Sequence, residues 1–266
     1  MKLSISNIGW QAQDDLKVYE LMKAHGFAGL EIAPTRIFPD NPYEDLKEAQ
    51  EWSLKIKADQ GFNISSMQSI WYGRSEKVFG SEEERNALID YTKKAIDFAE
   101  AIGCPNLVFG CPRNRSIPDD AKIEDSVPFY KTLGDYASTH GCIVAMEANP
   151  PIYNTNFINT TKQALDLIKM VDSEGFLLNL DVGTMVENKE GVSVLEGYEK
   201  YIHHVHISEP GLKPVEKRSL HNELAALLKA ARYDGFVSIE VGKQDDVMAL
   251  DSMMDHVEAV FGWEKN

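Results

Sequence analysis

Three of the chain's seven histidines lie in one short segment, YIHHVHISEP, at residues 201–210. Histidines grouped in this way are metal ligands, catalytic bases or core residues that are satisfied by hydrogen bonds. Three other apolar runs each carry one acid, namely Glu147 in MEANP, Asp181 in LLNLDV and Glu240 in SIEV. An unpaired carboxylate is costly in an apolar run, so each of these acids needs a cation or a polar partner.

The segments that must position these residues are short apolar runs, which alternate with amphipathic helical stretches along the whole chain. We expect strands in residues 3–9, 29–33, 63–70, 106–110, 142–148, 176–183, 203–208 and 236–241. Their nearly continuous apolar character is typical of parallel strands that are buried on both faces. Several of the helical stretches end in a glycine just before the next strand, which predicts left-handed helix caps.

Eight strand–helix units predict a (β/α)8 TIM barrel, forming a single domain over residues 1–266. The alternative is a doubly wound open sheet. That fold would predict a glycine-rich phosphate loop after the first strand, and SNIGWQAQDD contains no GxGxxG motif.

In a barrel of this kind the active site lies at the C-terminal ends of the strands. Period-two alternation points Glu147, Asp181, His206 and Glu240 inward from four consecutive strand ends. Three carboxylates and one imidazole suit a divalent ion such as manganese, magnesium or cobalt better than a closed structural zinc site. The sequence therefore predicts a metal centre with positions left open for a substrate.

The other two histidines of the segment receive different interpretations. His204 shares the inward face with His206, two residues deeper, and is either a core histidine or a residue that orients a metal ligand. Alternation points His203 the other way, toward the helices, in a structural role. Glu31 also lies on an expected strand, and the sequence assigns it no role.

The segments MEANP, LDVGTM, HVHISEP and SIEV, in this order, resemble those of the xylose isomerase-like TIM barrels. This family comprises sugar and sugar-phosphate isomerases and epimerases, including ketose 3-epimerases. The resemblance implies that the four strand-end residues bind a divalent metal. It also implies that Glu147 and Glu240 act as catalytic acid and base. Manganese is the expected ion, with magnesium, cobalt and zinc as alternatives.

The chemistry implied is proton transfer beside a carbonyl. A metal on the carbonyl and hydroxyl oxygens acidifies the proton on the intervening carbon and stabilises the ene-diolate, while a glutamate removes and returns the proton. Three positions depart from the ketose 3-epimerase pattern. Tyr153, Thr184 and Leu212 stand where those enzymes usually have a glutamate, a histidine and an arginine.

Further residues near the strand ends are candidates for substrate binding. Arg113 and Arg115 in FGCPRNR, which we place on the rim, would anchor a phosphate or carboxylate, unless they form only surface ion pairs. The other candidates, each with an ordinary packing or loop role as the alternative, are Trp71, Glu209, His221 and Lys243.

The same centre would serve related reactions, so alternatives remain. Hydroxypyruvate isomerase and inosose dehydratase-like lyase chemistry begin with the same proton abstraction, and a non-catalytic sugar-binding barrel is a third interpretation. An apurinic-site endonuclease is disfavoured, because Gln68 and Thr184 occupy positions where its metal cluster needs histidine.

Composition limits the partners. The net charge of −15 opposes binding to nucleic acid and to anionic membranes, which leaves a small carbohydrate as the expected partner. A homo-oligomer is compatible with the resemblance. No apolar run reaches the ~18 residues of a spanning helix, and the N-terminus shows no leader pattern, so we expect a cytoplasmic protein. The three cysteines form no CxxC pair and are expected to be free thiols.

Overall fold

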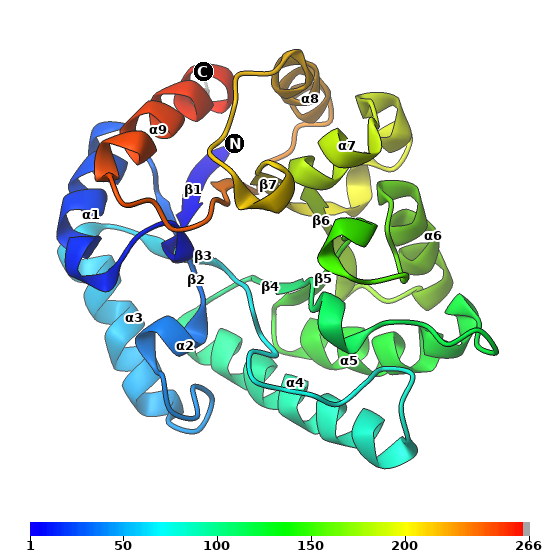
Figure 1. The fold of residues 1–266 in the computed structure, drawn as a ribbon. Helices are drawn as coiled ribbons and strands as arrows, with labels where there is room; N and C mark the ends of the chain where they lie inside the picture. Colours follow the sequence, from blue (N-terminus) through cyan, green and yellow to red (C-terminus); the bar gives the residue numbers. More distant parts are fainter. Residues whose placement is uncertain (263–266) are drawn as a thin grey trace.

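The computed structural model describes residues 1–262, in which eight parallel strands close into one barrel (Figure 1). Each strand pairs with its sequence neighbours, and the last strand pairs with the first. The strands are β1 (Lys2–Ser6), β2 (Gly29–Ile32), β3 (Asn63–Met67), β4 (Asn106–Phe109), β5 (Ile143–Glu147), β6 (Phe176–Asp181), β7 (Ile202–Ile207) and β8 (Phe236–Ile239). The predicted (β/α)8 barrel is confirmed, and the open-sheet alternative is wrong.

Helices surround the barrel on its outer side (Figure 1). They are α1 (Asp15–Ala24), α2 (Pro34–Ile37), α3 (Leu46–Gln60), α4 (Glu82–Ile102), α5 (Val127–Thr139), α6 (Thr161–Val171), α7 (Val182–Asn188), α8 (Ser219–Ala230) and α9 (Val247–Phe261). Among these described helices, none combines the length and the apolar character needed to cross a membrane.

Helix ends follow local capping rules. Helix α4 begins at a capping box in which Ser81 and Glu84 satisfy each other's backbone N–H groups, and it ends at Gly103, whose φ of 67° is left-handed. Two predicted glycine caps are wrong. The left-handed residue after α8 is Arg232, with φ of 56°, and not Gly235. Helix α6 ends instead at Asp172, with φ of 45°. Gly175 serves a close approach, because a Cβ there would lie 2.0 Å from the carbonyl oxygen of Gly134.

The strand register separates an apolar layer from a polar barrel interior. Outward-facing residues such as Leu30, Leu107 and Leu178 are buried between the strands and the helices. Ser6, Glu31 and Ser66 are paired across β1, β2 and β3 and are fully buried. Because buried polar groups need hydrogen-bond partners, this interior forms a connected polar network beneath the strand ends.

Strand β7 contains a bulge at His203 that the sequence did not predict. Leu178 pairs with Ile202, whereas the next residue of β6, Asn179, pairs with His204, so His203 is an extra residue in β7. Its Nδ1 lies 2.8 Å from Oδ1 of Asn106 on β4, which is across the barrel from β7. The expectation that His203 points toward the helices is therefore wrong, because the bulge breaks the alternation.

Candidate metal centre

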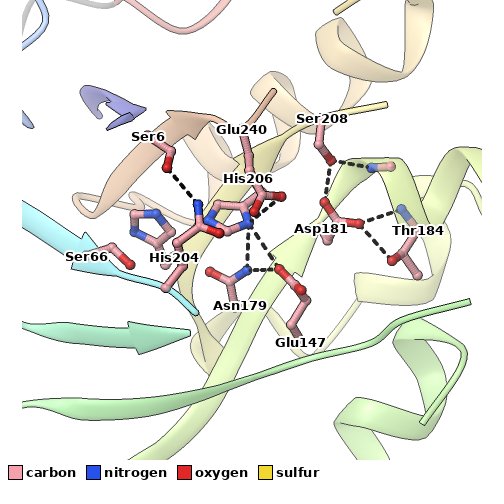
Figure 2. Close-up of polar contacts among 12 residues, drawn as sticks. Ser6, Ser66, Glu147, Asn179, Asp181, Thr184, His204, His206, Ser208 and Glu240 are labelled. Carbon is pink, nitrogen blue, oxygen red and sulfur yellow. Dashed lines mark hydrogen bonds and ion pairs between the residues drawn. The ribbon is translucent and has the colours of Figure 1, made fainter. Parts of the chain in front are cut away.

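Four ligand-type side chains meet at the C-terminal ends of β5 to β8 (Figure 2). Glu147 and Asp181 are the last residues of β5 and β6, His206 is paired with Asp181, and Glu240 directly follows β8. One ligand atom from each residue lies within 4.8 Å of the others, so the group could hold a metal ion. The structure thus brings together the four residues predicted from the strand ends.

The three carboxylates of this cluster are almost completely removed from water. Burial, together with repulsion from Glu147 and Asp181, raises the pKa of Glu240 to about 7, although His206 opposes the shift. Burial and repulsion from Glu147 also raise the pKa of Asp181. Since one imidazole cannot neutralise three acids, a divalent cation would relieve this repulsion, and the donor set fits such an ion.

Asp181 is held by the start of α7. Its Oδ2 accepts hydrogen bonds from the backbone N–H of Thr184, at 2.7 Å, and from the Thr184 hydroxyl, at 2.8 Å. Ser208 donates to the other oxygen and accepts from the N–H of Gly183 at 2.8 Å. Thr184, one of the departures from the epimerase pattern, therefore fixes the carboxylate of Asp181.

Glu147 has a different partner on each oxygen. Oε1 accepts from Nδ2 of Asn179 at 2.8 Å and lies 3.0 Å from Nδ1 of His206, as Figure 2 shows. Oε2 accepts from Nδ2 of Asn149 at 2.9 Å. Neither asparagine is among the site residues predicted from the sequence. The signal available was their position, since Asn179 lies two residues before Asp181 on the same strand face and Asn149 follows Glu147 by two.

A second buried cluster lies deeper in the barrel. Oε2 of Glu31 is 2.9 Å from Nε2 of His204 and 3.0 Å from Nε2 of His206, and Oε1 accepts from Gln68 at 3.0 Å. Burial opposes ionisation, yet His206 and His204 hold the pKa of Glu31 below its usual range. Glu31, His204 and His206 also have ligand atoms within 4.8 Å of one another. His204, interpreted from the sequence as a core histidine or as a residue that orients a metal ligand, contacts the same Glu31 oxygen as His206.

A cavity of about 620 Å³ is lined by the carboxylates of Glu147, Asp181 and Glu240. Its remaining walls come mainly from the segments that follow β3, β4, β5 and β7. They include Gln68, Trp71, Tyr72, Arg74, Cys111, Arg113, Asn149, Tyr153, Ser208 and Leu212. This volume is in the range of small-molecule sites, and the polar groups converge on one part of the lining.

Two of the predicted substrate-binding residues, Trp71 and Arg113, line this cavity. Trp71 is 3% exposed. Its Nε1 donates to Thr92 at 2.8 Å. Its ring packs edge-on against that of Phe109, with 4.6 Å between the ring centroids. Trp71 therefore forms a packed wall of the cavity, whereas Arg113 is exposed.

Arg115 lies behind the site, so the expectation that it lies on the rim is wrong. Its side chain has no exposed surface. The guanidinium donates to the carbonyl of Glu147 at 2.8 Å and to Oδ1 of Asn149 at 2.6 Å. Arg113 lies within the short 3-10 helix Pro112–Asn114 and is exposed, whereas Arg115 directly follows that helix and is buried.

The remaining candidates lie outside the cavity lining. Glu209 is buried and accepts two hydrogen bonds from Arg218, at 2.7 Å and 2.5 Å, which ties down the segment between β7 and α8. His221 is buried between α8 and α9, with its Nδ1 2.9 Å from Nε2 of His256. Lys243 is exposed. The structure therefore brings none of these three residues into the cavity lining.

Comparison with known proteins supports the fold and the family. A family model described as "Xylose isomerase-like TIM barrel" matches residues 19–259. No curated protein matches the chain.

Solved structures with the same fold include two named as sugar epimerases. D-psicose 3-epimerase from Clostridium cellulolyticum H10 has a TM-score of 0.79 and 17% identity, covering 98% of this chain and 99% of that one. The 3-keto-D-glucoside 4-epimerase of E. coli has a TM-score of 0.75 and 18% identity, covering 99% and 100%. A probable 3-DHS dehydratase from Bacillus anthracis has a TM-score of 0.68 and 17% identity, covering 98% of each chain. At these identities the likeness shows the fold alone.

Proposed function

Because this chain belongs to the xylose isomerase-like TIM barrel family, we propose that it is a divalent-metal-dependent isomerase or epimerase. Its substrate would be a small sugar, sugar phosphate or related hydroxy-carbonyl compound. The two sugar epimerases of the same fold support a carbohydrate substrate. The observation that carries the proposal is the buried group of three carboxylates and one imidazole that lines a cavity of small-molecule size.

Residues Glu147, Asp181, His206 and Glu240 would hold the ion. An oxygen-rich set with a single imidazole favours manganese first, with magnesium and cobalt next and zinc last. When bound, a divalent ion supplies Lewis acidity toward the carbonyl and hydroxyl oxygens of a substrate.

The protein's own part of the reaction is proton transfer by two glutamates. Glu147 and Glu240 project from β5 and from the end of β8, which are not neighbours in the barrel, and both line the cavity. One would remove the proton from the carbon beside the carbonyl, and either one would return it. Asn149 and Asn179 would keep the Glu147 carboxylate in one orientation, since each donates to a different oxygen.

The proposal is tested by exchange of substrate protons with solvent deuterium, followed by NMR on a panel of ketoses, aldoses, keto-inositols and their phosphates. The metal-loaded protein should exchange the proton beside the carbonyl of at least one compound. Glu147→Gln and Glu240→Gln should each slow that exchange ~100-fold or more, which is the usual contribution of a general acid or base.

The matched control is Glu223→Gln, which changes an exposed glutamate of α8 outside the cavity and should exchange like the wild type. Absence of exchange on the whole panel with metal-loaded protein would contradict the proposed function.

A further inference from the structure

The cavity that holds the acidic cluster also carries positive charge. Glu147, Asp181 and Glu240 lie together in one part of its lining, whereas Arg74 and Arg113 come from the segments that follow β3 and β4. The chain as a whole has 27 basic and 42 acidic residues, so two arginines in one cavity run against the overall charge. A neutral sugar on a metal centre gives no reason for these two cations.

The two segments are fastened to each other, which fixes the backbone of both arginines. Nδ2 of Asn114, a buried residue, donates to the carbonyls of Arg74 at 3.2 Å and Glu76 at 2.8 Å. The N–H of Val78 donates to the carbonyl of Asn114 at 2.8 Å. Nζ of Lys77 donates to the carbonyl of Arg113 at 2.5 Å. The fold itself therefore fixes the backbone positions of Arg74 and Arg113.

The two guanidinium groups differ in their interaction partners within the protein. Arg74 pairs with Glu76 and lies over the ring of Tyr91, 4.7 Å from its centroid. Its Nε is buried and has no hydrogen-bond partner among residues 1–262. Arg113 forms no ion pair with any residue in the described part of the chain, although it lines the cavity. A guanidinium without a carboxylate partner has N–H donors available for an anion.

We propose that the substrate carries an anionic group, a phosphate or a carboxylate, that binds Arg113 and Arg74 while the reacting carbons lie at the acidic cluster. The proposal rests on the proposed function and names its substrate class. Arginine suits this role because its planar donors match both phosphate and carboxylate oxygens. The acidic cluster would repel the same anion, so opposite charges on two parts of the lining would orient the substrate in one direction.

The first test is calorimetric titration of the intact protein with inorganic phosphate and, separately, with acetate. Arg113→Gln and Arg74→Gln should each weaken binding about 10- to 100-fold, because each removes charge-assisted hydrogen bonds. Arg232→Gln, an exposed arginine outside the cavity, is the matched control and should bind like the wild type. Glu240→Gln distinguishes anion binding at the arginines from anion binding at the metal site. This variant should still bind the anion.

The two anions show which anionic group the substrate carries. Tighter phosphate binding indicates a sugar phosphate, and tighter acetate binding indicates a sugar acid. Failure of both anions to bind would overturn the inference. Equal binding by the wild type and both cavity-arginine variants would also overturn it, as would binding that is lost only in Glu240→Gln.

The second test is kinetic and separates the two proposals. For a compound pair that differs only in a terminal phosphate or carboxylate, the charged member should have the higher kcat/KM, and Arg113→Gln should remove that advantage chiefly through KM. If the neutral member is preferred and Arg113→Gln changes nothing, the inference fails while the isomerase proposal stands. If anions bind through Arg113 but no compound exchanges a proton, the anion site stands and the proposed function fails.

Discussion

Nε2 of His206 lies 3.0 Å from Oε2 of Glu31, and neither side chain has any exposed surface. On the other side of the ring, Nδ1 of His206 faces Glu147 at 3.0 Å and Glu240 at 3.3 Å. A buried carboxylate beside Nε2 favours the proton on that nitrogen and leaves the lone pair of Nδ1 for a cation. In the proposed metal centre, Glu31 would therefore be a positioning residue for His206.

This relationship predicts that Glu31→Gln will weaken metal binding about 10- to 100-fold, the usual effect of removing such a partner. The isosteric change keeps the volume but removes the charge that fixes the imidazole. Chelator competition with Mn²⁺ measures the affinity. Glu190→Gln, at a partly buried glutamate next to Thr161, is the control. Wild-type affinity in Glu31→Gln would show that His206 needs no such partner.

A second prediction concerns Arg113 and Arg115, because the first side chain is exposed and the second is buried. Arg115→Lys removes the fork that reaches Asn149 and the carbonyl of Glu147, leaving buried acceptors without donors. We expect the free energy of unfolding to fall by about 1–3 kcal/mol for this variant. Arg113→Lys, the same change at the exposed neighbour, should be nearly neutral. Urea unfolding measures both, and equal effects would argue against the buried placement of Arg115.

His25 predicts a pH dependence of stability. It follows α1, and its two ring nitrogens lie 2.8 Å from Glu258 and 2.9 Å from Asp251 on α9. Burial lowers the pKa of His25, but the hydrogen bonds that its ring donates to Asp251 and Glu258 more than offset it, so the folded pKa is raised above 6.5. The stabilisation is therefore complete below the unfolded pKa and is lost as the pH rises through the folded value.

The variant His25→Gln should accordingly lower Tm more at about pH 5.5 than at about pH 9, where the wild-type imidazole is neutral. Thermal unfolding at the two pH values measures the difference. His140→Gln, at a partly buried histidine after α5, serves as the comparison for general effects of losing an imidazole. A deficit of the same size at both pH values would contradict the charged contact between α1 and α9.

The sequence predicted the barrel and the meeting of four strand-end side chains because both depend on regular features. Apolar runs alternate with amphipathic helices, and inward positions recur with period two up to Glu147, Asp181 and His206. The prediction fails where regularity fails. His203 is turned inward by a bulge, and Arg115, directly after the Pro112–Asn114 turn, is buried. The bulge has no marker in the local sequence, and Pro112 indicates a turn without indicating the direction of Arg115.

The contacts of Glu31 illustrate a different limit. Its inward direction follows from alternation on β2, but its partners His204 and His206 lie 173 and 175 positions away along the chain. No spacing rule connects residues so distant, and only closure of the barrel brings them together. The same applies to Arg74, because only the fold brings its segment to Asn114, 40 positions away along the chain.

The most direct test of the central claim is the metal content of the purified protein, measured by plasma mass spectrometry after loading with Mn²⁺ and desalting. The wild type and Glu223→Gln should retain about one divalent ion per chain, whereas His206→Ala and Glu240→Gln should retain little or none. Circular dichroism on the same samples checks that the variants are folded. A wild-type protein that retains no ion after loading with excess Mn²⁺, Mg²⁺, Co²⁺ or Zn²⁺ would contradict the metal centre and the reaction proposed from it.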